Sequence, residues 1–330
     1  MTGDPVQLAE DVANVALSGR AAFDVSQTGV LVYRTGQPSG RTFALSWFDR
    51  KGNSLGIAGE PGPYTQVRLS PDDKRVAVAR VDSKTNTWDI WNLELSNNIL
   101  TRLTFDPAHE QNPAWPQDGR SVVYTSQRMG RFDFFQKAVG GTTESLLFES
   151  DDHPKYPDDF SSDGRFLLYH TQTVLYALPL TGDRKPIPLD QTPFKKGEAR
   201  FSPDGRYVTY ESNESGATQL YVASFPAFDD RRQLTAHGGA EPQWRSDGKE
   251  LFYLTPDRKL MAVDVKTSPS LAFGVPHILF EVPLGNLSSF DLYSVTRDGR
   301  RFLFPTLQRD TVPPRPITVV VNWNAGLKKP

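Results

Sequence analysis

Short runs in which hydrophobic and polar residues alternate recur along the chain and are separated by turn-forming residues. Representative runs are VLVYRT (30–35), RVAVAR (75–80), RYVTYES (206–212) and ELFYLT (250–255). Alternation at every second position is typical of a strand that buries one face. Apolar residues at helical spacing are nearly absent. The pattern therefore predicts an all-β protein.

A turn motif repeats along the chain just before these runs. Its copies follow one another at intervals of 41 to 51 residues, close to the length of a four-stranded propeller blade. The seven copies are VSQTG (25–29), LSPDD (69–73), WPQDG (115–119), FSSDG (160–164), FSPDG (201–205), WRSDG (244–248) and VTRDG (295–299).

Each repeat contains enough strands for one propeller blade. The turn joins the first two strands, a third strand such as WDIWNLEL (88–95) follows, and most repeats add a shorter fourth such as LTRLTF (100–105). Four-stranded antiparallel sheets arranged in a ring leave few exposed edges. We therefore predict a seven-bladed β-propeller that forms a single domain over residues 1–330. The expected blades are 20–60, 64–106, 110–150, 154–192, 196–236, 239–282 and 287–323, with an additional N-terminal strand at 5–10.

The two ends of the chain suggest how the ring closes. The last repeat reaches its third strand, ITVVVNW (317–323), and has no fourth. We expect PVQLAE (5–10) to pair beside it and to close the ring with strands from both termini. Six blades are the alternative, because the last interval is the longest and the first turn lacks the aspartate.

The repetition also assigns a role to the turn residues. A turn of this type needs a short side chain that can bond the local backbone, as Asp204 can, and then a residue that tolerates a positive φ, such as Gly205. One carboxylate per turn does not supply the ligand set of a calcium loop. The large aromatic residues just before the turns have the spacing expected for packing between blades. They are Trp115, Phe160, Phe201 and Trp244.

Composition and charge exclude several classes of function. The chain has no cysteine, so disulfides, thiolate metal sites and a cysteine nucleophile are excluded. Its 37 basic and 39 acidic residues are scattered, which argues against nucleic-acid binding. The chain contains no run of 18 apolar residues, so the sequence does not predict insertion into a membrane. We expect a soluble monomer that needs no cofactor.

The loops that enter the first strand of each repeat carry the candidate chemistry. Three of the five histidines lie there, with carboxylates and a lysine pair in neighbouring loops. We expect these loops to converge at one mouth of the central channel, on the face opposite the repeated turns, and to bind a ligand there. Exposed polar residues are ordinary in loops, so a metal or acid–base site is only the alternative. The candidates are His109, Glu110, Asp151, Asp152, His153, Lys195, Lys196, Glu198, His237 and Glu241.

These motifs resemble the TolB-like branch of the WD-type propeller repeats, and the resemblance covers nearly the whole chain. More narrowly, RLTFDPAHEQNPAW (102–115), WRSDGKELFYLTPDRKLMAVDVKT (244–267) and PITVVVNWNAGLKK (316–329) resemble the C-terminal propeller of bacterial eukaryotic-like serine/threonine protein kinases. That resemblance implies a sensory or protein-binding module that follows a kinase domain. No kinase, serine-hydrolase or P-loop motif is present in the chain.

The sequence therefore predicts a non-catalytic propeller that binds a protein, a peptide or a small molecule, in keeping with the sensor portion of a bacterial signalling protein. An enzyme, either a lyase or a hydrolase, and a structural adaptor are the alternatives. The location stays open from the sequence and would be extracytoplasmic for the sensor of a membrane kinase.

Overall fold

The computed structural model describes two compact units built from strands. It covers residues 9, 12, 14–15, 20–34, 42–82, 85, 87–151, 154–268, 270–283, 292–308 and 317–323. The larger unit is Phe43–Leu307, and the smaller unit combines Met1–Thr42 with Gln308–Pro330. No helix occurs among the described residues, so none of them forms a helix that could span a membrane. The all-β prediction is confirmed.

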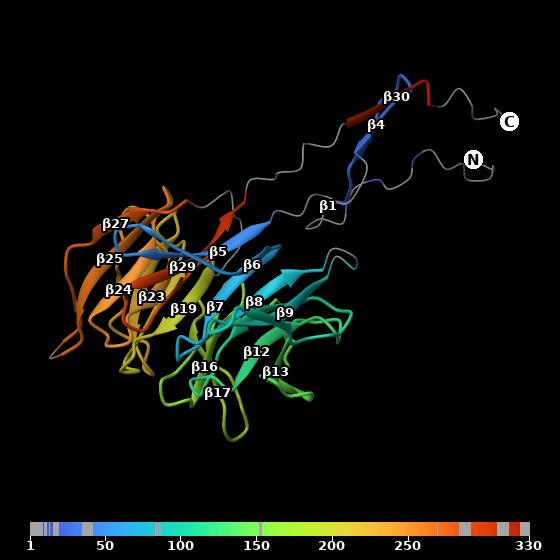
Figure 1. Ribbon diagram of the computed structural model, residues 1–330. Coiled ribbons are helices and arrows are strands. Elements are labelled where there is room, and N and C mark those ends of the chain that lie inside the picture. Colours follow the sequence, from blue (N-terminus) through green and yellow to red (C-terminus); the bar gives the residue numbers. More distant parts are fainter. Residues whose placement is uncertain are drawn as a thin grey trace. The chain divides into compact units, whose positions relative to one another are not determined.

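Five sheets of the larger unit are each built from consecutive antiparallel strands (Figure 1). Sheet 1 contains β7 (Tyr64–Leu69), β8 (Arg75–Val81), β9 (Trp88–Glu94) and β10 (Ile99–Arg102). Sheet 2 contains β11 (Glu110–Ala114), β12 (Ser121–Ser126), β13 (Asp133–Ala138) and β14 (Glu144–Phe148). Sheet 3 contains β15 (Tyr156–Phe160), β16 (Phe166–His170), β17 (Leu175–Pro179) and β18 (Ile187–Asp190). Sheet 4 contains β19 (Lys196–Phe201), β20 (Tyr207–Ser212), β21 (Gln219–Ser224) and β22 (Arg232–Gln233). Sheet 5 contains β23 (Ala240–Trp244), β24 (Glu250–Leu254) and β25 (Lys259–Lys266), and both β26 (Ala272–Phe273) and β27 (His277–Glu281) pair with β25.

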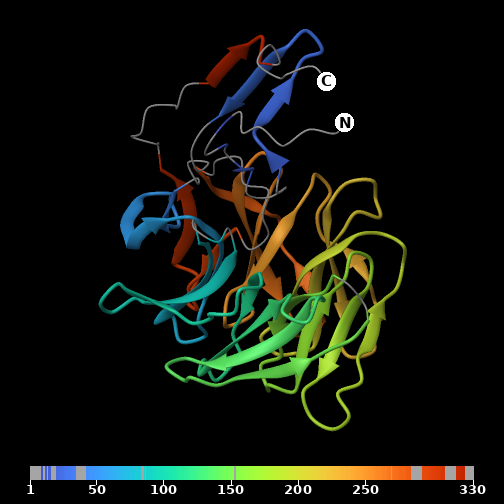
Figure 2. The ribbon, with the colours of Figure 1, turned by 90° about the vertical axis from the view of Figure 1, so that its right-hand side faces the viewer.

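Sheet 6 combines strands from distant parts of the chain. Its order is β28 (Ser294–Val295), β29 (Arg301–Leu307), β5 (Phe43–Asp49) and β6 (Ser54–Gly62). β29 pairs with β5 in one continuous register, from Arg301 opposite Asp49 to Leu307 opposite Phe43. The blue strands β5 and β6 accordingly lie beside the red strand β29 (Figure 2).

The grouping of strands in the predicted blades 20–60 and 287–323 is therefore wrong. Strands from both ranges share sheet 6, whereas β3 (Phe23–Val25) and β4 (Val30–Arg34) pair with β30 (Ile317–Val321) in the smaller unit. The physical reason is that alternation marks a strand and the face it buries, but does not say which distant strand meets its edge. The single-domain organisation over 1–330 stays a prediction.

Hydrogen bonds join each sheet of the larger unit to the next and sheet 6 back to sheet 1. We call the strand that precedes the repeated turn in each of these sheets its inner strand. Asn112 N of inner strand β11 donates to Gln66 Oε1 of β7 at 2.7 Å, and Phe201 N of β19 donates to Asp159 Oδ2 of β15 at 2.9 Å. Leu69 N of β7 donates to Ser294 Oγ of β28 at 3.1 Å. The remaining links are Gln117 Nε2 to Phe160 O, Glu241 N to Glu211 Oε1 and Tyr293 OH to Glu241 O.

The repeated turns have the predicted geometry. At the turn between β19 and β20, Ser202 Oγ donates to Asp204 Oδ1 at 2.6 Å, Arg206 N donates to the same oxygen at 3.1 Å, and Gly205 has φ +71°. The backbone N–H two residues after the turn aspartate donates to its carboxylate in the five other copies that contain it. The structural role of the turn carboxylates is thereby confirmed.

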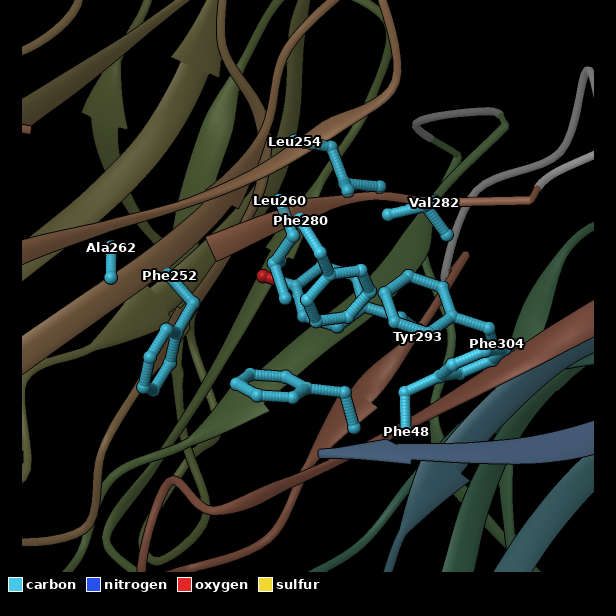
Figure 3. Close-up of a cluster of buried hydrophobic side chains, with 10 residues drawn as sticks. Phe48, Phe252, Leu254, Leu260, Ala262, Phe280, Val282, Tyr293 and Phe304 are labelled. Carbon is cyan, nitrogen blue, oxygen red and sulfur yellow. The ribbon is translucent and has the colours of Figure 1, made fainter. Parts of the chain in front are cut away.

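Large apolar side chains fill the spaces between the sheets. Trp115, Phe160 and Phe201 are buried and Trp244 is partly buried, each against residues of the preceding sheet, which confirms their predicted packing role. A cluster between sheets 5 and 6 brings together Phe48, Phe280, Tyr293 and Phe304 (Figure 3). It connects β5, near the N-terminus, to strands close to the C-terminus.

The smaller unit contains the first copy of the turn motif. Residues 25–29 join β3 to β4, and β4 pairs with β30 from Val30 opposite Val321 to Arg34 opposite Ile317. β1 (Asn14–Val15) pairs with β2 (Arg20–Ala21). The predicted strand at 5–10 lies outside the described residues, apart from Ala9, so its pairing with 317–323 stays a prediction.

Candidate binding site at the inner strands

The larger unit presents two faces with different loops. Because the strands of each sheet alternate in direction, the turn after the first strand and the loop before it lie at opposite ends of that strand. We call the end that carries the loops before β11, β15, β19 and β23 the entrance face. The predicted site loops lie there, opposite the repeated turns.

Four of the predicted site residues lie on the surface or close to it. His109 is half-buried against Trp88, with ring centroids 5.9 Å apart. Asp151 pairs with Arg131 at 2.9 Å. Lys195 and His237 are exposed. Asp152 and His153 lie outside the described residues.

Two other predicted residues are buried in ion pairs between strands. Glu110 accepts hydrogen bonds from Ser126 and Arg128. Lys196 Nζ donates to Thr192 Oγ1 at 2.8 Å and to Phe194 O at 3.0 Å, and lies 3.6 Å from Asp190. Burial lowers the pKa of Lys196. Lys196 was expected in a loop, but it is the first residue of β19, whose residues are all buried.

The described residues offer no metal centre to support the alternative function. No group of three or more histidine, aspartate or glutamate side chains among them is arranged to hold a metal ion.

Buried charged side chains of the inner strands meet at the centre of the larger unit. Arg200 of β19 pairs with Glu198 at 2.7 Å, and Arg68 of β7 reaches the same carboxylate at 3.4 Å. Both arginines also donate to the carbonyl of Asp158, each at 3.2 Å. Sheets 1, 3 and 4 are therefore connected through one polar network. We call the network and its charged neighbours the central cluster: Arg68, Asp158, Asp159, His170, Glu198, Arg200, Glu211 and Glu241.

His170 and Asp158 form a buried pair within the central cluster. His170 Nδ1 lies 2.9 and 3.0 Å from the two oxygens of Asp158. Burial works against a charged ring, but the Asp158 carboxylate outweighs it, so the pKa of His170 is raised above its usual range. The contact with the Asp158 carboxylate therefore favours the protonated imidazole of His170 over the neutral ring.

Glu211, like Asp159, is a member of the central cluster that is only partly buried. It lies opposite Gly197 in the β19–β20 pair, and a Cβ at position 197 would lie 3.5 Å from Glu211 Oε2. Glu211 Oε1 accepts a 2.7 Å hydrogen bond from Glu241 N in the next sheet. Burial, followed by the Glu198 carboxylate, raises the pKa of Glu211 to about 8. Glu211 thus holds a proton at neutral pH.

Irregularities in the inner strands position these side chains. The pairing register shifts within β11, β19 and β23, and the residue at each shift has a positive φ: 55° at Asn112, 38° at Glu198 and 58° at Glu241. All three lie four residues before the second residue of the repeated turn motif. A bulge of this kind redirects a side chain at a fixed place in each repeat.

The structure thus brings Glu198 and Glu241 into the central cluster, and the other described candidates are not members of it. Arg68, Asp158, Asp159, His170, Arg200 and Glu211 were missed by the sequence analysis. One signal was available in the sequence. In three repeats, a charged residue lies two positions before the second residue of the turn motif: Arg68, Asp159 and Arg200.

The strand topology and the turns define the class of the protein: the fold is that of a β-propeller. No protein-family model matches the chain. The Tol-Pal system protein TolB of Francisella tularensis is 25% identical over 198 residues, which are 57% of this chain and 45% of that protein. The chain therefore matches less than half the length of this curated relative.

Two solved structures share the fold. A putative TolB from Agrobacterium tumefaciens superposes with a TM-score of 0.65 at 16% identity, over 82% of this chain and 100% of that one. TolB from Acinetobacter baumannii superposes with a TM-score of 0.56 at 17% identity, over 86% of this chain and 78% of that one. The TolB-like fold is thereby confirmed, whereas the narrower resemblance to kinase-linked propellers stays a prediction.

Proposed function

We propose that this protein is a non-catalytic β-propeller that binds a protein or peptide at its entrance face. The observation that carries the proposal is the contrast between the two faces. The turn face repeats one hydrogen-bonded motif, whereas the loops of the entrance face differ and expose Phe105, Met129 and Phe194. Apolar side chains exposed on variable loops are typical of a protein-binding surface. The similarity to TolB, named as a Tol-Pal system protein, supports a role alongside other proteins.

Site-specific photo-crosslinking in the native host tests this proposal. A benzophenone side chain placed at Phe105 or Phe194 should crosslink to the same partner. The same group at Arg300, which is exposed at a repeated turn, is the control and should not. Equal crosslinking from all three positions, or none from Phe105 and Phe194, would contradict an entrance-face site.

We also propose that the six sheets of the larger unit are six blades, closed where β29 pairs with β5. The cycle of hydrogen bonds between inner strands and the mixed sheet 6 support this count. Deleting residues 1–12 distinguishes it from the seven-bladed alternative. The melting temperature of the larger unit should stay unchanged with six blades, and should fall by several degrees if residues 5–10 close the ring.

The sensory role rests on the resemblance to kinase-linked propellers. The native reading frame upstream of Met1 tests it. A kinase domain and a membrane span encoded there would support a sensor outside the cytoplasm. A free-standing frame with an export signal would instead favour a periplasmic binding protein.

One observation favours an enzyme as the second candidate. The His170–Asp158 pair and the protonated Glu211 place an acid and a base in one cluster. An oligogalacturonate lyase crystallised with manganese shares the fold, with a TM-score of 0.54 at 12% identity over 87% of this chain and 96% of that one. Cleavage of oligogalacturonate by the wild type, lost in Glu211→Gln, would establish the enzyme, and no cleavage would exclude this substrate.

A further inference from the structure

The three-stranded sheet of the smaller unit has a cavity on one face. Across the β3–β4 pair, Phe23 lies opposite Tyr33 and Val25 lies opposite Leu31. Paired residues of neighbouring strands share a face, and so do residues two apart, so these four side chains lie together. Phe23 is 57% exposed and Val25 is 40% exposed, which leaves the cavity accessible at the β3 edge. We call it the apolar pocket; its volume is about 240 Å³, and its lining is Ala9, Val12, Phe23, Val25, Leu31, Tyr33 and Trp323.

Trp323 reaches the apolar pocket because the chain is irregular after β30. Val320 pairs with Leu31 of the pocket, so Val321 lies on the other face of the sheet. Regular alternation would place Trp323 on that other face too, two residues after Val321. Asn322 interrupts the alternation with a φ of +52°, a conformation that asparagine tolerates better than most residues. Trp323 N then donates at 3.2 Å to the carbonyl of the last residue of the β3–β4 turn.

The indole of Trp323 brings a hydrogen-bond donor to this apolar lining. Its Nε1 is buried and has no hydrogen-bond partner among the described residues. Burial of an unpaired N–H is unfavourable, and buried indoles in proteins usually have an acceptor. No charged side chain belongs to the described lining. A neutral ligand with an acceptor oxygen for this N–H therefore matches the chemistry of the pocket.

We propose that the apolar pocket binds a small, neutral aromatic molecule of about two fused rings, with an oxygen that accepts a hydrogen bond from Trp323 Nε1. An apolar cavity of about 150 Å³ in another protein holds benzene, so about 240 Å³ has room for a second ring. The rings of Phe23, Tyr33 and Trp323 favour an aromatic ligand through stacked and edge-to-face contacts. A charged ligand would lose hydration without gaining a counter-charge. The pocket belongs to the smaller unit, and the inference does not rest on the proposed function.

Nuclear magnetic resonance of the full chain labelled with ¹⁵N-tryptophan tests the inference. The six tryptophans give six indole signals, and Trp323→Phe identifies the one that belongs to Trp323. Coumarin, a neutral bicyclic lactone with a carbonyl acceptor, should bind and move the Trp323 indole proton downfield. Naphthalene lacks the acceptor and should bind several-fold more weakly. The charged 2-naphthoate should bind about tenfold more weakly than coumarin. No saturable shift with coumarin, or tighter binding of 2-naphthoate, would overturn the inference.

Matched variants locate the ligand. Val25→Trp fills the apolar pocket from an exposed position and should abolish coumarin binding. Val319→Trp adds the same side chain on the other face of the sheet, where Val319 is 57% exposed, and should leave the affinity unchanged. Trp323→Phe should weaken coumarin several-fold and naphthalene little, because only the donor for the carbonyl is lost. Equal loss of coumarin binding in both folded tryptophan variants would refute the site. Tighter binding of acetyl-Gly-Trp-Gly-amide than of coumarin would refute a free small molecule as its ligand.

Discussion

At the scale of single residues, the fold gives carboxylates opposite properties according to their place on a strand. Asp163, in a repeated turn, accepts hydrogen bonds from Ser161 and from the backbone and side chain of Arg165, which lower its pKa to about 2. Glu211 lies near the end of β20 that is away from the turn, and its pKa is raised to about 8. The fold stabilises the ionised form of Asp163 and the protonated form of Glu211. The two residues should therefore affect stability in different pH ranges and with opposite sign.

Asp163→Asn tests the turn. A carboxylate whose pKa is depressed on folding adds stability above its unfolded value near 3.8 and loses it as the pH falls towards 2. The wild type should therefore lose stability over that range, and the variant should lose less. Chemical unfolding at pH 2 to 5 measures this, with Asp183→Asn in another loop as the control. Parallel curves for wild type and Asp163→Asn would contradict the assignment.

Glu211→Gln tests the central cluster. The folded pKa of Glu211 lies above its unfolded value, so the protonated acid stabilises the fold at low pH, and this contribution is lost as the pH rises from about 4.5 to about 8. The raised pKa of His170 acts in the same direction. Melting temperature should decline between pH 6 and pH 8.5 in the wild type and decline less in Glu211→Gln. An equal or steeper decline in the variant would show that Glu211 is ionised in the fold.

At the scale of elements, the cluster in Figure 3 fixes sheet 6 against sheet 5. The ring of Phe304 in β29 stacks on Tyr293 at 5.2 Å and meets Phe48 of β5 at 6.0 Å. Phe304→Ala should cost about 3–5 kcal/mol, because it opens a cavity between the sheets. Denaturant unfolding measures this. Ile278→Ala on β27 is the matched control, since 54% of Ile278 is exposed, and it should cost under about 1 kcal/mol.

The strands themselves could be predicted from the sequence, because each carries its signal locally. The run RYVTYES contains β20, and RVAVAR lies within β8. The turn before each run was equally local, since Ser202 and Arg206 both donate to Asp204. The pairing partner of a strand could not be predicted in the same way. β5 pairs with β29, more than 250 residues away, and neither strand's sequence indicates that the other is its partner.

The candidate site was harder to predict than the strands. Histidines and lysines in loops attract attention, yet His237 and Lys195 are simply exposed. Arg68 and Arg200 lie within strands, where each side chain reaches Glu198 from a different sheet. The raised pKa values of His170 and Glu211 likewise depend on neighbours that only the fold brings together. A charged residue that recurs at one position of a buried strand was the available indication.

At the scale of the whole molecule, the larger unit depends on contacts between segments far apart in the chain. In sheet 6, β29 and β5 bury a hydrogen bond between Ser46 Oγ and Thr306 Oγ1 at 2.6 Å, and β28 bonds onward to β7. Loss of one contact between neighbouring sheets would therefore interrupt the cycle of hydrogen bonds that links all six sheets. Cooperative unfolding of all six sheets follows from this arrangement, in contrast to an open row of repeats.

A disulfide between β5 and β29 tests that dependence directly. Ala44 and Thr306 are directly paired across the two strands, and the natural chain has no cysteine that could form a competing bond. Ala44→Cys with Thr306→Cys should raise the melting temperature when oxidised, because the bond closes a loop of some 260 residues, worth about 5.5 kcal/mol by chain entropy. The gain should disappear on reduction, and Thr306→Cys alone reports the cost of losing the Ser46 contact. If the oxidised variant instead has the same melting temperature as its reduced form, unfolding of the larger unit does not begin at the junction of β5 and β29.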